Sequence, residues 1–542
     1  MEDASLLFKG NPAFSLFFVG ASMKSLGSMV LRKQTIWTLL RLYPGVIREV
    51  LRRRRLSFWY KTSRSCHHQT VWAYADRHSI EPGQSFRLMM SAGPGTGAVS
   101  GHFEIFRIGY YGDLDRKRAW QGKPIEIPEY GMNNSAAAIG PGWPAAIEIS
   151  STGQWQTGYH SIDFVERNGR RHEDIAFMVV TAPQRKVDVL VKLATTTYQA
   201  YNRWGGHNFY LYETPASISG DPLGPFESDI PANRGDMVSF DRPTVSEFWE
   251  WEYFYVLWLE RLAQEEGFSV GYATNFDLVR DRTFTSDCKL LIHAGHDEYW
   301  SREEFDYTHD RIFRQGGNTM FLGANIAYWQ VRYADINAIE GKEGRQLICF
   351  KSTSDPIRYR TLTNPDLHIT ARFRENARRP ESMLLGVAYQ SNLSYRRQES
   401  PRFSYYVEST DLPFFDGTGY EPGEEVGEIV GHEWDNRDPE QAYGCPGEPR
   451  VAATDRLWHP NHSQIDPIPR MKISTVFSGD VTDLAGRKGR AEAAYFESEA
   501  GARVFSSGTI RWSWGLGKAR YRREKFRRFN RNLLLHCLED EG

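Results

Sequence analysis

The stretch Leu290-Leu291-Ile292-His293-Ala294-Gly295-His296-Asp297-Glu298-Tyr299-Trp300 decides the fold, because an apolar segment runs directly into a cluster of ionisable side chains. Its first five residues predict a strand buried on both faces, and Ser301 with Glu304 predicts a capping box that opens a helix. His296 and Glu298 are therefore expected at the carboxyl end of a strand, where ligand-binding and catalytic groups collect in open α/β sheets. The alternative is that His296 and Asp297 merely cap the next helix.

A second strand and loop follow this cluster. A helix is predicted over 302–314, Gly316-Gly317 ends it, and Thr319 to Gly323 is predicted to be another buried strand. Strands joined by one right-handed crossover are parallel and usually neighbours. We therefore expect Asn325, in the loop after the second strand, at the same sheet edge as the ionisable cluster.

Composition limits the class of protein. The chain has 542 residues, of which 40% are hydrophobic and 25% charged, as expected of a globular protein with two or three domains. Lys and Arg number 66 against 68 Asp and Glu, so no net field recruits nucleic acid. Aromatic residues reach 14%, so a single tyrosine is usually a packing residue. The five cysteines form no CxxC pair, which argues against a disulfide framework or a zinc cage: Cys66, Cys288, Cys349, Cys445 and Cys537.

Residues 1–69 are predicted to be an extension that is partly helical or disordered. The segment shows neither a signal peptide nor a membrane-spanning helix, so we expect a cytoplasmic protein. Ile36 to Leu51 is amphipathic and precedes Arg52 to Arg55, a combination that can touch a membrane surface or a partner. A solvated extension is the preferred interpretation.

Two further domains are predicted after this extension. Residues 70–182 contain short apolar runs separated by Gly and Pro turns, which favour an antiparallel β-sandwich. Val187 to Val191 begins an α/β domain over 183–542, and a long helix is predicted from Ser246 to Gly267. The expected fold is therefore a sandwich followed by a mostly parallel α/β domain.

Six motifs in the order found here resemble those of the large subunit of N,N-dimethylformamidase and its relatives, over roughly residues 70 to 540. They are Tyr-Gln-Ala-Tyr-Asn-x-x-Gly-Gly (198 to 206), Trp-Glu-Tyr (251 to 253), Gly-His-Asp-Glu-Tyr-Trp-Ser (295 to 301), Gly-Ala-Asn (323 to 325), Gly-His-Glu-Trp-Asp (431 to 435) and Gly-Thr-Ile-Arg-Trp-Ser-Trp-Gly-Leu (508 to 516). The resemblance implies a three-layer, amidotransferase-like α/β domain after the sandwich.

The resemblance also implies a mononuclear non-haem ferric site with two tyrosinates and one glutamate. The glutamate falls on Glu298, and Tyr201 and Tyr253 are the matching tyrosines. Other tyrosines lie close to these two in the sequence and stay open as ligands: Tyr198, Tyr210, Tyr212 and Tyr255. Phenolate and carboxylate are hard oxygen donors, which suit Fe³⁺ better than zinc.

Three catalytic residues follow from the same motifs. The resemblance places a catalytic histidine at His296, a pocket asparagine at Asn325 and a general-base glutamate at Glu433. The expected roles are proton transfer for His296 and Glu433 and a hydrogen bond to the developing oxyanion for Asn325. A buried salt bridge from Glu433 to Arg437 or Arg450 is the structural alternative.

The expected function is metal-dependent hydrolysis of a small, N-substituted formamide-like amide. The enzyme that the motifs resemble works with a small helical subunit, so this chain either has such a partner, does without one, or replaces it with residues 1–69; an oligomer is expected. One alternative is a glycan-binding or scaffold protein with a degenerate amidotransferase-like domain. Another is a zinc hydrolase that uses His293, His296 and Glu298, which requires the side chain of His293 to face the same pocket.

Overall fold

The computed structural model describes most of the chain between residues 71 and 539. The described ranges are 71–182, 186–210, 235–244, 246–281, 283–334, 344–352, 354–359, 365–374, 379–392, 403–437, 472–483, 486–518 and 523–539. The predicted extension, including the amphipathic segment and the arginine run, lies outside them, as do Cys66, Cys445, Tyr212 and Arg450. No helix among the described residues is both long and apolar enough to cross a membrane.

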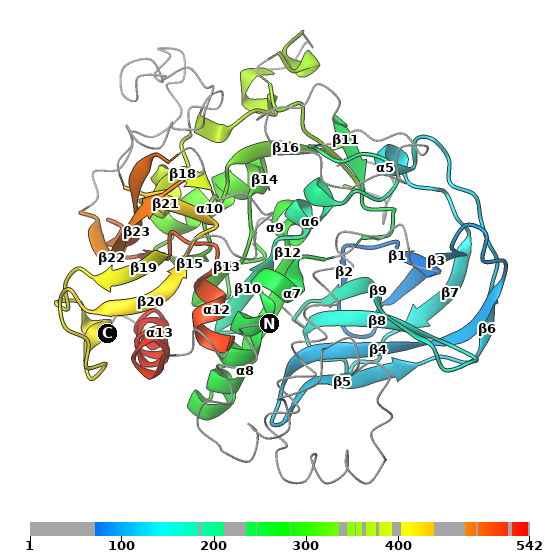
Figure 1. Cartoon of the computed structure of the whole chain (residues 1–542), viewed down its shortest axis with the longest axis horizontal. Coiled ribbons are helices and arrows are strands. Elements are labelled where there is room, and N and C mark those ends of the chain that lie inside the picture. The colour runs from blue at the N-terminus through cyan, green and yellow to red at the C-terminus, as the bar shows by residue number, and fades with distance from the viewer. Residues whose placement is uncertain are drawn as a thin grey trace, which may run out of the picture. The chain divides into compact units, whose positions relative to one another are not determined.

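The first part of the described chain forms two stacked sheets (Figure 1, blue to cyan). A three-stranded antiparallel sheet has the order β1 (Val71–Ala75), β3 (Ser85–Ala92), β7 (Ala145–Ser150). A larger sheet has the order β2 (Ser79–Ile80), β9 (Arg171–Val180), β8 (Gly158–Glu166), β4 (Val99–Tyr111), β5 (Leu114–Gln121), and β6 (Ile125–Ile127) also pairs with β4. Phe86 of one sheet and Phe103 of the other belong to one buried core, as predicted for a β-sandwich.

A nine-stranded sheet forms the centre of the α/β part. Its order is β12 (Val270–Thr274), β10 (Val189–Leu193), β13 (Leu290–Ala294), β15 (Asn318–Leu322), β24 (Arg503–Ser506), β23 (Lys488–Glu497), β22 (Ser474–Thr482), β19 (Phe403–Val407), β20 (Glu425–Val430). The strands from β12 to β24 are parallel, and the following pairings are antiparallel. The predicted parallel pairing of the strands that precede His296 and Asn325 is confirmed.

Helices and two smaller sheets complete the described chain. The helices are α5 (Ala136–Ile139), α6 (Thr195–Tyr201), α7 (Phe248–Trp251), α8 (Tyr253–Glu266), α9 (Asn275–Arg280), α10 (Arg302–Phe313), α11 (Ser382–Leu385), α12 (Trp512–Gly517) and α13 (Glu524–His536), with 3₁₀ turns η4 (Pro356–Tyr359), η5 (Pro365–His368) and η7 (Pro413–Phe415). The smaller sheets have the orders β11 (Met237–Ser239), β17 (Gln346–Ile348), β16 (Trp329–Ala334), β14 (Tyr299–Ser301), and β18 (Ala388–Asn392), β21 (Glu433–Asn436).

Two local predictions are corrected by the structure. The helix predicted from Ser246 to Gly267 is interrupted at Glu252, which separates α7 from α8. Ser301 caps α10 as expected, because its hydroxyl accepts from the Glu304 amide at 3.1 Å. The Glu304 carboxylate completes no capping box, however, since it pairs with Lys192 Nζ at 2.7 Å. The cap of α10 is therefore neither His296 nor Asp297.

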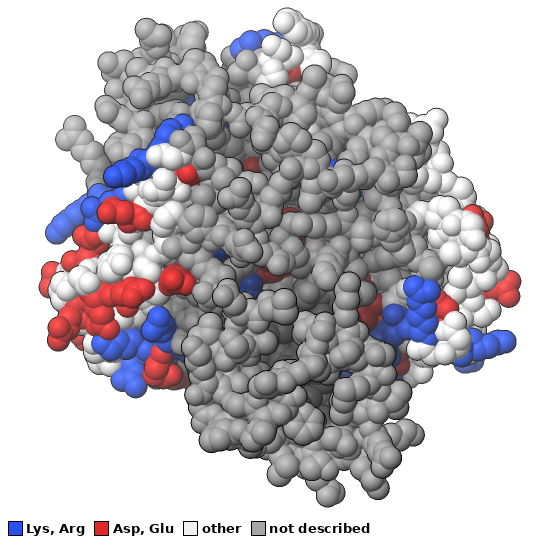
Figure 2. Space-filling view, viewed as in Figure 1, with Lys and Arg blue, Asp and Glu red and all other residues white. Residues whose placement is uncertain are grey.

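Buried polar contacts join the sandwich to the α/β part. Arg107 of β4 pairs with Glu260 of α8 at 2.6 Å, and both side chains are nearly buried. Asp174 of β9 accepts from the Trp249 indole of α7 at 2.7 Å. The hydrogen bond from Trp249 to Asp174 thus anchors α7 to the sandwich. On the face in Figure 2, acidic and basic side chains of the described residues lie side by side.

Candidate functional site

Two tyrosine hydroxyls and one carboxylate meet beyond the carboxyl end of the parallel strands. The Tyr201 hydroxyl donates to Glu298 Oε2 at 2.6 Å. The Tyr210 hydroxyl lies 3.0 Å from Glu298 Oε1 and 2.9 Å from the Tyr201 hydroxyl. Glu298 is buried, whereas both tyrosines are half-buried. The three oxygen donors therefore form one compact set.

Short segments after β10 and β13 hold these side chains in place. The Thr197 hydroxyl in α6 accepts from the Glu298 amide at 3.0 Å, which ties the helix carrying Tyr201 to the loop carrying Glu298. Asn208 bonds to both tyrosines, since its Nδ2 donates to the Tyr201 carbonyl at 2.9 Å and its Oδ1 accepts from the Tyr210 amide at 2.8 Å. One asparagine thus sets the spacing of the two rings.

His296 lies beside this set and is surrounded by three carboxylates. Its Nδ1 lies 3.0 Å from Glu247 Oε2, while its Nε2 lies 3.4 Å from Glu298 Oε2 and 3.5 Å from Glu433 Oε2. Burial alone lowers the pKa of His296, but the charge of Glu433 and the bonds to Glu247 and Glu298 raise it well above the ordinary value. We therefore expect His296 to carry a proton at neutral pH.

The two neighbouring glutamates respond in opposite directions. Burial raises the pKa of Glu433 to about 8, although the charge of His296 works against this rise. Burial also acts to raise the pKa of Glu298, but the hydrogen bond and charge of His296, with the charge of Lys351, bring it below its ordinary value. Glu298 is thus the ionised member, and Glu433 can exchange a proton near neutral pH.

Glu433 and Asn325 reach the site from distant parts of the sequence. Glu433 opens β21, and Asp435 in the same strand accepts from the Asn325 amide at 2.9 Å. Asn325 has a left-handed backbone with φ of 59°, and among the described residues its Oδ1 has no hydrogen-bond partner. Arg437 binds Thr475 through its side chain at 2.7 Å, so this arginine is not the partner of Glu433.

The structure does not bring Tyr253 to the oxygen set. This tyrosine begins α8 and its hydroxyl donates to Asp115 of β5 at 2.5 Å, toward the sandwich. Of the alternatives, Tyr198 donates to Glu252 at 2.5 Å, and Tyr255 is buried within α8. Tyr210 occupies the second position beside Glu298.

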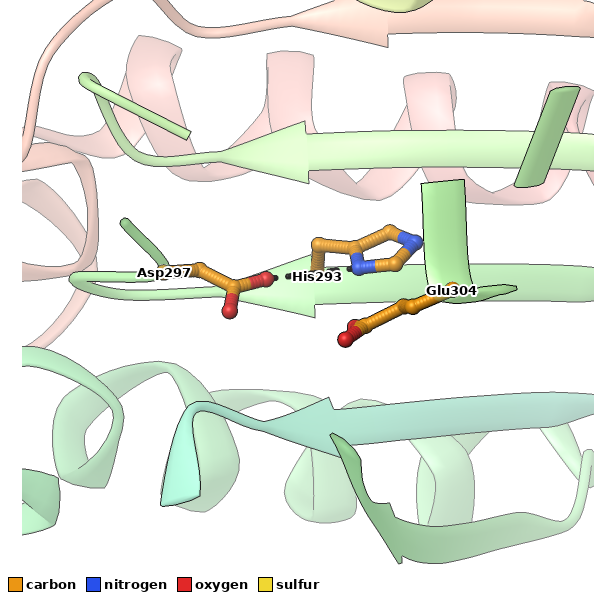
Figure 3. Close-up of side chains that lie close together, drawn as sticks. All are labelled: His293, Asp297 and Glu304. Carbon is orange, nitrogen blue, oxygen red and sulfur yellow. Dashed lines mark ion pairs between the residues drawn. The ribbon is translucent and has the colours of Figure 1, made fainter. Parts of the chain in front are cut away.

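A second buried group of possible ligands adjoins the site, since its member Asp297 stands between His296 and Glu298 in the chain. His293, Asp297 and Glu304 present ligand atoms within 4.8 Å of one another, so this triad could bind a metal (Figure 3). The Lys192 ammonium already pairs with both carboxylates of the triad. Because that ammonium supplies the positive charge between them, we assign the group as an ionic support beside the site.

His293 belongs to this support and not to the set around Glu298. Its ring stacks on Trp300 and Phe321 at 4.6 and 5.0 Å, and its Nδ1 lies 3.4 Å from Asp297. Burial lowers the pKa of His293 to about 4, so the ring is neutral. His296, in contrast, faces Glu247, Glu298 and Glu433, and the two histidines serve different clusters. This placement removes the basis of the zinc-site alternative.

The donor set of Tyr201, Tyr210 and Glu298 suits a small, hard ion. Oxygen ligands about 2.0–2.1 Å from an ion in octahedral geometry lie roughly 2.9 Å from one another. The two hydroxyls and Glu298 Oε2 are separated by 2.6 Å, 2.9 Å and 3.2 Å. Burial and the charge of Glu298 raise the pKa of Tyr210 well above its ordinary value, so its hydroxyl would lose the proton only to a bound cation.

Sequence reasoning missed Glu247 and Lys351. Glu247 precedes α7 with no motif of its own, and its role follows from the turn that aims it at His296. Lys351 lies outside the six motifs, but its ammonium makes a cation–π contact with the Tyr210 ring. A buried lysine gives no signal in the sequence, because most lysines are solvated.

Comparisons with known proteins identify one family. The family model "N,N-dimethylformamidase beta subunit-like, C-terminal" matches residues 102–525. No curated protein matches the chain. Two solved structures show likeness over a small part of the chain only. The sporulation control protein Spo0M from Bacillus subtilis is 10% identical over 21% of this chain and 50% of its own, with a TM-score of 0.15. A cohesin–dockerin complex from Clostridium thermocellum is 11% identical over 21% and 99%, with a TM-score of 0.11.

Proposed function

The chain belongs to the N,N-dimethylformamidase beta subunit-like family, and on this premise we propose that it hydrolyses a small amide at a mononuclear ferric site. The observation that carries the proposal is the convergence of Tyr201, Tyr210 and Glu298, whose two hydroxyls and Oε2 are three hard oxygen donors within 3.2 Å of one another. Tyr210 replaces Tyr253 as the second tyrosine ligand in this proposal. When bound, the ion supplies Lewis-acid activation of the amide carbonyl.

The residues around the donor set supply the proton transfers of amide hydrolysis. His296 carries a proton on Nε2, the ring atom that faces Glu298 and Glu433, and delivers it to the departing amine nitrogen. Glu247 holds the opposite ring nitrogen and so fixes the ring orientation. In its ionised form Glu433 takes a proton from the attacking water, and because burial raises its pKa to about 8 that form becomes more abundant as pH rises toward 8.

Asn325 is proposed to bind the developing oxyanion through its side-chain amide. Its backbone bond to Asp435 and its left-handed φ of 59° hold the residue in one orientation. Such strain is retained where the surroundings fix a functional geometry. Trp251 is buried beside the site, with its ring 6.5 Å from that of His296 and stacked on Trp514 at 5.5 Å, and so gives this side of the site an apolar character.

We retain domain boundaries of 1–69, 70–182 and 183–542, with an amidotransferase-like, three-layer arrangement of the last domain. Membership of a beta subunit-like family also supports a partner subunit and an oligomeric assembly. Size-exclusion chromatography with light scattering on the full chain, with and without candidate subunits, tests this part.

The function itself is tested by metal content and optical spectroscopy, together with turnover of dimethylformamide and related small amides. We expect about one iron per chain and a visible tyrosinate-to-iron charge-transfer band. Asn325→Ala and Glu433→Gln should each lower kcat by ~100-fold or more while keeping the iron. A colourless protein with stoichiometric zinc would refute the ferric site, and parental turnover by Glu433→Gln would refute the general base.

A further inference from the structure

Lys351 is a buried lysine enclosed by aromatic rings at the edge of the candidate site. Its Nζ lies 3.3 Å from the centre of the Tyr210 ring, 4.6 Å from that of Trp329 and 5.1 Å from that of Tyr299. Its relative exposure is 3%. One of the three rings belongs to a proposed metal ligand, so the ammonium and the donor set are in direct contact.

The small four-stranded sheet builds this enclosure. Tyr299 and Trp329 are register partners on the parallel strands β14 and β16, which places their rings side by side. Strand β17 pairs antiparallel with β16, and Lys351 follows β17 shortly after its last residue, Ile348. The same small sheet thus positions Lys351 and two of the rings around it, those of Tyr299 and Trp329.

Two features show that an ammonium at this place is costly. A buried charge loses its hydration, which cation–π contacts recover in part. Lys351 also has a left-handed backbone, with φ of 49°, a conformation that residues other than glycine rarely adopt. An apolar side chain would fill an aromatic enclosure without the loss of hydration. Costs of this kind persist where the surrounding structure enforces them, most often at functional sites.

The charge of Lys351 is felt by the donor set. Glu298 is buried, which raises its pKa, but the nearby His296 and then the Lys351 ammonium act in the opposite direction. The ammonium lies on the face of the Tyr210 ring, where the π-electron density of an aromatic ring is greatest. A ring that becomes anionic attracts a cation on its face more strongly than a neutral ring does.

We propose that Lys351 is a positioning residue for the metal ligand Tyr210: its ammonium stabilises the electron density of the ring and strengthens the hold of the site on its ion. The inference rests on the proposed function, because it assigns Tyr210 as a ligand. Lys351, which lies outside the six motifs, would then influence both how tightly iron is retained and the energy of the tyrosinate-to-iron transition.

The experiment compares Lys351→Met and Lys351→Arg in the iron-loaded full-length protein. We expect Lys351→Met to move the charge-transfer band to longer wavelength, because the electrons of the donor ring lose a stabilising charge. We also expect it to release iron to a chelator ~10-fold faster or more, as for other groups that support a metal ligand. Lys351→Arg keeps the charge and should restore both properties toward the parent values.

A matched control separates this contact from a general loss of charge. Arg372 is also buried and stacks on Trp329 at 5.2 Å and on Tyr328 at 5.5 Å. Arg372→Met should therefore leave the band nearly unshifted. An equal shift in that control, or an unchanged band and chelator rate in Lys351→Met, would overturn the assignment.

The same measurements separate a failure of the Lys351 proposal from a failure of the ferric site or of folding. If Lys351→Met fails to fold, Lys351→Gln, which keeps a polar side chain without the charge, must show the same shift, and a parental spectrum in that variant rejects the proposal. A parent protein without iron or a band refutes the ferric site itself, and the role of Lys351 with it. A parent with a normal band that no Lys351 substitution alters refutes the role of Lys351 alone.

Discussion

Replacement of Glu247 tests how the site orients its histidine. Glu247 lies 3.0 Å from His296 Nδ1, His296 is buried, and the glutamate side chain is 20% exposed. A hydrogen bond involving a charged group contributes about 1.5–3 kcal/mol. If this bond holds the ring in the reactive orientation, Glu247→Ala should lower kcat by roughly 10- to 150-fold with a small change in KM.

Glu247→Gln is the informative companion variant. Its amide oxygen still accepts from Nδ1 of the protonated ring, so we expect about half of the lost free energy to be recovered, because the bond keeps the charge of the histidine and loses that of the carboxylate. Glu250→Gln, three residues later on α7, removes a charge from the same helix and should leave kcat unchanged. Steady-state kinetics with iron content measured on each sample decide the matter. Parental kcat in Glu247→Ala, or iron loss equal to the activity loss, would refute the orienting role.

Three other tests, which use five substitutions, give separate outcomes. Glu298→Ala should lose its iron, whereas His296→Ala should keep the iron and lose turnover by ~100-fold or more, as metal analysis beside kinetics will show. Tyr210→Phe should abolish the charge-transfer band and Tyr253→Phe should keep it, and the reverse result would restore Tyr253 as the ligand. Burial raises the pKa of Glu252 from 4.5 to about 8, so the folded protein holds a proton that the unfolded chain releases, and stability falls as pH rises across that interval. The apparent Tm of Glu252→Gln should therefore exceed that of the parent at pH 8 and approach it at pH 5, a difference on the order of 4 kcal/mol in stability.

The sequence predicted the strands beneath the site because their signals are local. Leu290 to Ala294 and Thr319 to Leu322 are short apolar runs bounded by helix caps and glycines, and the structure pairs them in parallel as expected. The sandwich followed from short runs between turns in the same way. The interruption of the long helix at Glu252 had no such signal, since the apolar spacing continues through α7 and α8.

Side-chain direction was harder to predict than strand position. Tyr253 stands in a matching motif, yet the start of α8 turns its hydroxyl to Asp115 on the sandwich. Tyr210 carries no motif beyond its closeness to Tyr201, and its place follows from the bonds that Asn208 makes to both residues. Such a turn is fixed by tertiary hydrogen bonds, which a one-dimensional pattern does not encode.

The residues that sequence reasoning missed have a common physical origin. Glu247 reaches His296 because the sandwich anchors α7 through the bond between Asp174 and the Trp249 indole, a contact that spans 75 residues of sequence. Lys351 reaches Tyr210 because a separate small sheet brings its strand there. Both act on site residues through elements outside the motif-bearing strands. A substitution in the sandwich, such as Asp174→Asn, should therefore affect the orientation of His296 more than the retention of iron. A loss of turnover with iron retained would show that the sandwich contributes to catalysis, although its own sequence contains no acid–base cluster.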